Sequence, residues 1–263
     1  MTSGPVEFGV LGPIEMLAGG RSFPVGQPRQ REILAALLVD AGRVVSMDAL
    51  VERLWGASPP RQARRSLQAH IARIRSAIGV AAESVGASGV SLPVRDSGGY
   101  SMLTAGADQV DLSRFRALVA QARAADVGDH RRLRMLTEAR ELWRGEPLAG
   151  MESAWATRIR WALHREHVDA TVAWAYAELA AGDANVVPGP LTDLAELHPG
   201  SESIAVALMR ALYITGRLAD ALVWFERIRA WLRQEFGADP SPELAATHRA
   251  VLTHDPELFS VSG

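Results

Sequence analysis

The fold of this chain is decided by one stretch, which reads Pro59-Pro60-Arg61-Gln62-Ala63-Arg64-Arg65-Ser66-Leu67-Gln68-Ala69-His70-Ile71-Ala72-Arg73-Ile74-Arg75-Ser76-Ala77-Ile78-Gly79. The proline pair favours a helix start and Gly79 favours a helix end, so the stretch predicts one helix of about four turns. At 100° per residue, four apolar side chains fall within about 60° of each other and are expected to face a core. They are Leu67, Ile71, Ile74 and Ile78.

The opposite arc of this helix is polar and positively charged. Residues 53–82 hold six arginines and no acidic residue, in a chain whose net charge is only −2. Arginine, glutamine and serine around small alanines make a surface that can enter a DNA major groove. A solvated basic face would have the same composition, so the helix alone leaves both interpretations open. The arc consists of Arg65, Ala69, Ala72 and Ser76, flanked by Gln62 and Arg73 on one side and by Arg61 and Gln68 on the other.

The segments on either side of this helix favour the DNA interpretation. Short strands are expected at 6–11, 14–17 and 22–25, and helices at 28–41 and 47–55. Ser46 is the expected N-cap of the second helix, after an extended segment at 44–46. A loop at 80–89 and a hairpin of 90–94 with 99–103 should follow, with Pro93 in an edge strand and Arg95 at the tip. Strands, three helices and a hairpin together predict a winged helix-turn-helix, with the basic helix as its recognition helix.

The second half of the sequence reads as helices throughout. They are expected at 111–125, 129–143, 151–181, 191–197, 201–215, 218–236 and 242–252, and the segment 188–190 is expected to interrupt the helical structure. Gly216, Ala221 and Phe225 have the spacing of a tetratricopeptide repeat, although the rest of the pattern is degenerate. The predicted fold is therefore mainly α. An N-terminal winged helix-turn-helix (α+β) spans residues 1–104, and an all-α tetratricopeptide-like helical bundle spans residues 105–263.

The amino-acid composition excludes several kinds of functional site. The 263 residues suffice for two domains, and the sequence has no cysteine and no lysine. Disulfides, thiolate metal sites, lysine Schiff bases and lysine-containing phosphate loops are excluded. No apolar run reaches membrane-spanning length and the N-terminus lacks a secretory signal, so we expect a cytoplasmic protein without membrane contact. Residues 1–104 carry a net +3 and residues 105–263 a net −5, which fits a nucleic-acid module joined to a protein-contact module.

No enzyme signature is found in the sequence. His164 and His167 share a helix face but have no third ligand nearby, so a surface patch is expected there and not a metal site. No nucleophile elbow is present, and we predict no catalytic residue, metal or cofactor. Most tryptophans are in the helical half, at spacings typical of core residues. A hydrolase would remain an option only if a metal or nucleotide were found to bind.

Several motifs in combination make the whole chain resemble a known family. They are Phe8-Gly9-Val10-Leu11-Gly12-Pro13, Gln30-Arg31, Asp48-x-Leu50-x-x-x-Leu54-Trp55, Ser66-Leu67-Gln68-x-x-Ile71-x-Arg73-Ile74-Arg75, Leu208-x-x-Ala211-Leu212-Tyr213-x-x-Gly216-Arg217, and Phe236-Gly237-Ala238-Asp239-Pro240-Ser241-Pro242. Over about residues 6–255 the chain is similar to the Streptomyces antibiotic regulatory protein family, which pairs an OmpR-like winged helix with a bacterial transcriptional activation domain.

The resemblance implies an activator of a secondary-metabolite gene cluster. It implies binding to direct repeats in double-stranded promoter DNA, a possible dimer on DNA, and recruitment of RNA polymerase holoenzyme through its sigma factor and other subunits. Larger members add an ATPase domain and a sensor, and the sequence is compatible with either a small member or part of a large one. We expect no phospho-receiver domain ahead of residue 6.

Position on a helical wheel and along the chain divides the candidate DNA contacts into three kinds. Groove contacts are expected from Gln62, Arg65, Ser66, Gln68 and Arg73. Phosphate contacts are expected from Arg61, Arg64 and Arg75, and wing contacts from Arg95 and Tyr100. A second hypothesis makes the helical half the working part, as a protein-interaction or ligand-sensing module that the DNA domain merely localises.

Overall fold

The computed structural model describes residues 5–87, 91–102, 109–126 and 130–255. The chain forms two compact units. Unit 1 comprises Met1–Leu118 and Glu141–His164, and unit 2 comprises Val119–Arg140 and Arg165–Gly263. The expected division of the chain into domains at residue 104 stays a prediction.

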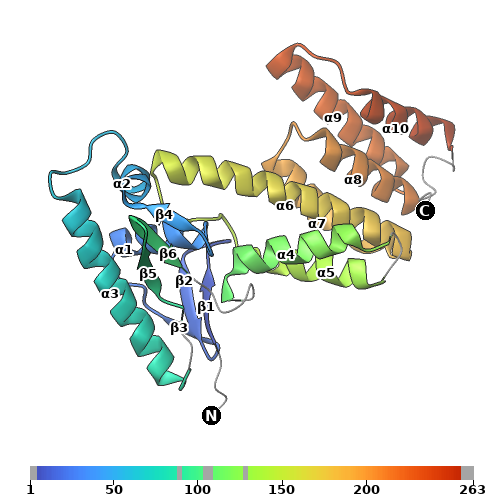
Figure 1. The fold of residues 1–263 in the computed structure, drawn as a ribbon. Helices are drawn as coiled ribbons and strands as arrows, with labels where there is room; N and C mark the ends of the chain where they lie inside the picture. Colours follow the sequence, from blue (N-terminus) through green and yellow to red (C-terminus); the bar gives the residue numbers. More distant parts are fainter. Residues whose placement is uncertain (1–4, 88–90, 103–108, 127–129, 256–263) are drawn as a thin grey trace. The chain divides into compact units, whose positions relative to one another are not determined.

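Unit 1 begins with a small antiparallel sheet in the order β1-β2-β3 (Figure 1). Val6 lies opposite Ala18 and Phe8 opposite Met16, and all four side chains are buried. Because alternate residues of a strand point to the same face, this face of the sheet packs onto the core. Helix α3 covers β1 and β2. The strands are β1 (Val6–Gly9), β2 (Glu15–Ala18) and β3 (Arg21–Phe23).

Three helices form the centre of unit 1: α1 (Pro28–Leu38), α2 (Met47–Trp55) and α3 (Ala63–Ser84). Helix α1 packs against both α2 and α3. The Ser46 hydroxyl accepts a hydrogen bond from the Ala49 backbone N–H at 3.1 Å. This bond satisfies one of the free N–H groups of the first turn, and it confirms the predicted N-cap and helix α2.

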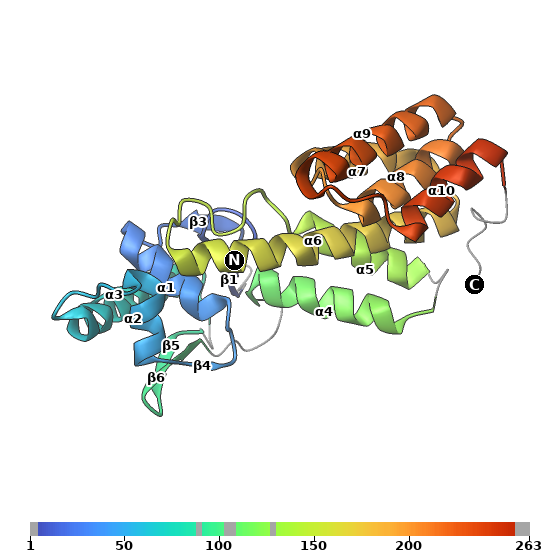
Figure 2. The same ribbon diagram turned by 90° about the horizontal axis from the view of Figure 1, so that it is seen from above.

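A second antiparallel sheet has the order β4-β6-β5. Its strands are β4 (Val44–Ser46), β5 (Pro93–Asp96) and β6 (Gly99–Met102). β5 is an edge strand, as Pro93 predicts, because proline has no N–H to give to a further strand. The two-residue turn Ser97-Gly98, in which Gly98 has φ +90°, projects from the unit (Figure 2). Three helices followed by this hairpin confirm the predicted winged helix-turn-helix.

The predicted end of the basic helix at Gly79 is wrong. Helix α3 starts at Ala63 and continues through Gly79 to Ser84, so residues 80–84, which were expected in a loop, are helical. Glycine inside a helix costs about 1 kcal/mol relative to alanine. Burial of Ala81 and Ala82, which the helix carries into the core beyond Gly79, offsets that cost.

Two later segments of the chain also belong to unit 1. Helices α4 (Asp111–Ala124) and α6 (Ala154–Ala181) both begin there. The Arg144 backbone N–H donates to the Leu11 carbonyl at 2.9 Å, and that of Leu148 donates to the Val10 carbonyl at 3.0 Å. The segment before α6 is therefore hydrogen-bonded to the connection between β1 and β2.

Unit 2 is helical in its described residues. Helix α8 is central, because it packs against α7, α9 and α10 (Figure 1). The predicted interruption of helical structure at 188–190 is wrong, because α7 begins at Pro188. Proline is tolerated in the first turn of a helix, where its missing N–H would have no partner within the helix. The elements are most of α5 (His130–Glu141), the later part of α6, the 3-10 helix η2 (Ala184–Val186), α7 (Pro188–Leu197), α8 (Glu202–Ile214), α9 (Leu218–Phe236) and α10 (Pro242–Thr253).

The pair of helices α8 and α9 forms a hairpin around Gly216, whose φ of +76° lies in the left-handed region. Ala221 and Phe225, both on α9, are buried. The relation to a tetratricopeptide repeat stays a prediction, whereas the mainly α fold, with a winged helix before a helical bundle, is confirmed. Trp155 and Trp174 are core residues, but Trp161 is 65% exposed.

Candidate nucleic-acid interface

Helix α3 has one buried face and one exposed face. The predicted core residues Leu67, Ile71, Ile74 and Ile78 are all buried, so the helix is oriented as the wheel requires. The opposite arc of Arg65, Ala69, Ala72 and Ser76 is exposed along its length. The face of the helix that would enter a DNA groove is therefore exposed to solvent.

Some of the expected groove residues lie where the helical wheel predicts, and others do not. Gln68 and Arg73 are exposed beside the arc, and Ser66 is half-buried. Arg61 lies in a turn ahead of α3, and Gln62 is the N-cap with φ −108° and ψ 25°, outside the helix. Their wheel positions therefore do not apply. Both are exposed, at the end of α3 that follows the two prolines.

Two arginines of α3 are already engaged within unit 1. Arg64 Nη2 lies 2.6 Å from Asp48 Oδ1 in the first turn of α2. Arg75 Nε donates to the Pro93 carbonyl at 2.6 Å, and its guanidinium lies 6.0 Å from the centre of the Tyr100 ring. Arg75 thus fastens the wing strand β5 to α3, which differs from the expected role of a phosphate contact.

The wing residues also differ from expectation. Tyr100 is only 5% exposed, so its ring is a core group, and its DNA contact stays a prediction. β6 is the central strand of its sheet and all four of its residues are buried, which the sequence alone does not show. Arg95 is exposed but lies within β5, opposite Tyr100, and not at the tip. The tip is Ser97-Gly98, and the Ser97 hydroxyl lies 2.9 Å from Asp96 Oδ1.

His70 is a half-buried group of α3 that the sequence reading passed over. Burial lowers its pKa below the ordinary 6.5, and the positive charges of Arg73 and Arg29 lower it further. This shift favours the neutral imidazole over the charged form.

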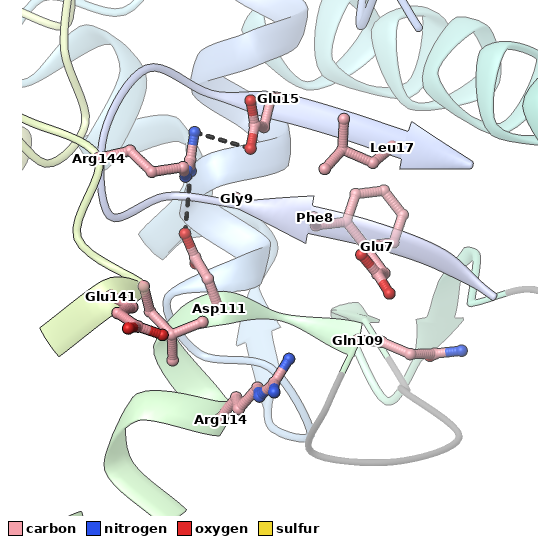
Figure 3. Close-up of a pocket in the computed structure, with 11 residues that line it drawn as sticks. Glu7, Phe8, Gly9, Glu15, Leu17, Gln109, Asp111, Arg114, Glu141 and Arg144 are labelled. Carbon is pink, nitrogen blue, oxygen red and sulfur yellow. Dashed lines mark hydrogen bonds and ion pairs between the residues drawn. The ribbon is translucent and has the colours of Figure 1, made fainter. Parts of the chain in front are cut away.

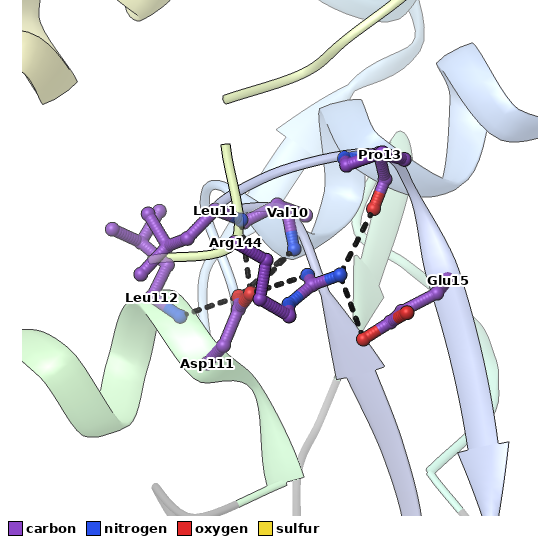
Figure 4. A network of polar contacts seen from close by, with 7 residues as sticks. All are labelled: Val10, Leu11, Pro13, Glu15, Asp111, Leu112 and Arg144. Carbon is purple, nitrogen blue, oxygen red and sulfur yellow. Dashed lines mark hydrogen bonds and ion pairs between the residues drawn. The ribbon is translucent and has the colours of Figure 1, made fainter. Parts of the chain in front are cut away.

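A polar network joins the first strands of unit 1 to the later segments of the same unit (Figure 4). The Asp111 carboxylate accepts hydrogen bonds from the backbone N–H of Val10 and Leu11, each at 2.9 Å. Arg144 reaches Asp111 at 3.0 Å and Glu15 at 2.7 Å. A Cβ at Gly9 would overlap the Arg144 guanidinium, so the glycine permits this close approach. The sequence signals only a helix start at Asp111, and nothing in it points to Arg144.

A cavity of about 160 Å³ adjoins this network (Figure 3). Its walls carry four carboxylates and two guanidinium groups, and Arg144 reaches both Glu15 and Asp111 at its edge. The pairs of Arg144 with Glu15 and Asp111 are structural, because they join the first strands of unit 1 to its later segments. The charged residues are Glu7, Glu15, Arg114, Asp111, Glu141 and Arg144.

The described ranges offer neither a metal-binding cluster nor a membrane-spanning helix. No group of three or more histidine, cysteine or acidic residues that could hold a metal ion is found there. His164 Nε2 lies 3.1 Å from Glu146 Oε2. None of the helices in those ranges is long and apolar enough to cross a membrane.

Both halves of the chain match known families. Residues 25–87 match the family described as "Transcriptional regulatory protein, C terminal", and residues 110–252 match "Bacterial transcriptional activator domain". Among solved structures, Mycobacterium tuberculosis EmbR in complex with a low-affinity phosphopeptide is similar, with a TM-score of 0.83 and 32% identity. The match covers 95% of this chain and 66% of that chain.

Curated relatives agree with these matches. The transcriptional regulatory protein MoaR1 of Mycobacterium tuberculosis is 32% identical over 97% of this chain and 82% of its own length. The transcriptional regulator RedD of Streptomyces coelicolor is 33% identical over 97% and 73%. The regulatory protein AfsR of the same organism is 34% identical over 99% of this chain, but only over 25% of its own length.

A winged helix with an exposed basic helix, followed by a bacterial transcriptional activator domain, defines a class of bacterial transcriptional regulators. Within that class, this chain belongs to the Streptomyces antibiotic regulatory protein family.

Proposed function

We propose that this chain is a sequence-specific DNA-binding transcription activator and not an enzyme. The observation that carries the proposal is the two-faced helix α3, whose apolar side chains are buried while the opposite, arginine-bearing arc is exposed. A recognition helix needs both faces, one for its own domain and one for the groove. A protein that acts on promoter DNA in this way works in the cytoplasm.

Gel-shift titration of the full-length chain on promoter DNA tests this proposal. Arg65→Ala and Gln68→Ala should each lose affinity, by about 1–3 kcal/mol for a side chain that reads a base. Arg217→Ala is the control, because Arg217 lies in unit 2 and pairs with Asp220 at 2.7 Å. Wild-type affinity in both α3 variants would overturn the assignment of α3 as the reading helix.

The target in this proposal is a pair of direct repeats in the promoter of a secondary-metabolite gene cluster, as in antibiotic biosynthesis. Membership of the family supports it. Footprinting on the promoters of the neighbouring cluster should show repeats about one helical turn apart, bound by two chains head to tail on one DNA face. A palindromic footprint would instead indicate a two-fold dimer and overturn this arrangement.

Activation would proceed by recruitment of RNA polymerase holoenzyme, including its sigma factor. The match of residues 110–252 to an activator domain and the net negative charge of residues 105–263 support this step. In vitro transcription with purified holoenzyme should increase when the full-length chain is added to a promoter that carries the repeats. No increase, with the promoter fully bound by the chain, would overturn recruitment.

A second candidate function makes unit 2 a module that binds a ligand or another protein. It is favoured by a cavity of about 260 Å³ between α7 and α9, where Trp224, Ile228 and Trp231 form an apolar wall. Ala230→Arg would fill this cavity from an exposed position of α9. Loss of transcription with DNA binding intact would support this function, and unchanged transcription would overturn it. The full-length chain is needed, because unit 1 itself extends beyond residue 104.

A further inference from the structure

The arginines of α3 differ in whether their guanidinium groups are free to bind DNA bases. Arg64 pairs with Asp48, and Arg75 donates to the Pro93 carbonyl. Arg65 and Arg73 are exposed, and neither has an ion-pair or hydrogen-bond partner among the described residues. The described part of unit 1 therefore leaves the five N–H donors of each of these two guanidinium groups unused.

The two free arginines are placed to reach the same groove. They are eight residues apart, which corresponds to about 12 Å along the helix axis and about 80° around it. Between them lie Ala69 and Ala72, both exposed and without side-chain atoms beyond Cβ. The backbone of α3 can thus come close to the base edges, while Arg65 and Arg73 extend toward them from either end.

The chemistry of a free guanidinium in the major groove favours one base. Guanine presents two acceptors there, O6 and N7, and their spacing matches the planar fork of arginine. Asp48 holds Arg64, whereas no carboxylate among the described residues pairs with Arg65 or Arg73. A contact to phosphate would use the charge but not the fork.

We propose that Arg65 and Arg73 each bind one guanine of the recognition sequence through O6 and N7. The inference rests on the proposed DNA-binding function. With base pairs about 3.4 Å apart along the duplex, a separation of about 12 Å places the two guanines three or four base pairs from each other. Arg64 and Arg75 take no part in base reading.

The test starts with selection of tightly bound duplexes from a random library by the full-length chain. Each guanine of the selected sequence is then replaced, one at a time, by 7-deazaguanine, which lacks the N7 acceptor and pairs normally with cytosine. Loss of one hydrogen bond to a charged donor should weaken binding roughly tenfold. For the wild-type chain we expect this loss at two guanines, three or four base pairs apart.

Variants then assign each guanine to its arginine. Arg65→Ala should bind the normal and the 7-deaza duplex equally at one of the two positions, and Arg73→Ala should do so at the other. Because each variant is compared with itself on two duplexes, any general loss of affinity cancels, as in a double-mutant cycle. Arg75→Ala is the matched control and should retain both sensitivities.

The outcomes separate this inference from the proposed function. If selection yields no specific duplex, both are overturned. If a specific duplex is bound but no guanine is sensitive to N7 removal, the proposed function stands and guanine reading is overturned. Guanine reading by Arg65 and Arg73 is equally overturned if the sensitivity disappears in Arg75→Ala and persists in Arg65→Ala and Arg73→Ala.

Discussion

The carboxylate of Asp111 lies 3.0 Å from Nη2 of Arg144, although 33 residues separate them in the sequence. The same carboxylate accepts two backbone N–H groups from the connection between β1 and β2. One half-buried ion pair therefore joins three parts of the chain: the first strands, the start of α4 and the segment that precedes α6.

Replacement of Asp111 should destabilise the protein. Asp111→Ala leaves the N–H groups of Val10 and Leu11 without their acceptor and Arg144 without one of its two carboxylates, which should cost about 1–3 kcal/mol. Urea unfolding of the full-length chain measures the loss. Asp220→Ala, which breaks an exposed pair, should change stability by less than about 1 kcal/mol. Equal effects of the two substitutions would contradict the structural role of Asp111.

Salt dependence should distinguish Arg75 from Arg61. Arg61 is exposed ahead of α3, and as a phosphate contact its replacement by alanine should reduce the salt slope of DNA binding by about one. Arg75→Ala should lower both affinity and melting temperature, because the wing loses its bond to α3, but it should leave the slope unchanged. Fluorescence anisotropy at several salt concentrations gives the slopes. A reduced slope for Arg75→Ala would show that Arg75 contacts phosphate.

Removal of the Asp48 charge should strengthen DNA binding. The pair with Arg64 is exposed, with side chains 80% and 67% accessible, so it contributes at most about 1 kcal/mol to stability. Asp48→Asn would release Arg64 for a phosphate and steepen the salt slope by about 0.9. It should also reduce stability by less than about 1 kcal/mol, since Asp48 lies in the first turn of α2. Unchanged or weaker binding would argue that Arg64 lies away from the DNA.

The stability of the chain should fall as the solution becomes acidic. The His248 ring stacks on Phe225 with centroids 3.7 Å apart. Burial lowers the pKa of His248 below 6.5, Glu226 opposes this shift and Arg229 adds to it. The unfolded chain therefore takes up the proton first, and stability is lost as the pH falls below about 6.5.

The variant His248→Phe keeps a stacked ring without a titratable group. Its thermal stability should depend less on pH in that range than that of the wild type, and His70 should account for part of the remaining dependence, because its pKa is also lowered. Parallel curves of melting temperature against pH would rule out a contribution from His248.

Periodic and local signals predicted the winged helix well. The four apolar residues of α3, the Ser46 cap and the edge position of Pro93 each follow from a rule that acts within a few residues. The same rules failed where distant packing decides the outcome. Burial of Ala81 and Ala82 carries α3 past Gly79, and Tyr100 is buried because β6 is the central strand, paired with both β4 and β5.

The candidate interface was predictable only in part for the same reason. Position on the helix separated Arg65 and Arg73 from Arg64 and Arg75, but it did not reveal the partners of Arg64 and Arg75 within unit 1. Asp48 is 16 residues from Arg64, and Pro93 is 18 residues from Arg75. No pattern of spacing along one helix reveals such pairs.

The bonds from Arg144 and Leu148 to the connection between β1 and β2 have a consequence for how such regulators can diversify. In a chimera of two relatives joined near residue 105, Val10–Gly12 would come from one parent and residues 144–149 from the other. The hydrogen bonds between these two segments would then have to form between residues that did not evolve together. DNA specificity is therefore exchanged more readily when residues 141–164 are transferred together with the winged helix, or when point substitutions are made on the exposed arc of α3. Both routes preserve the hydrogen bonds between Val10–Gly12 and residues 144–149.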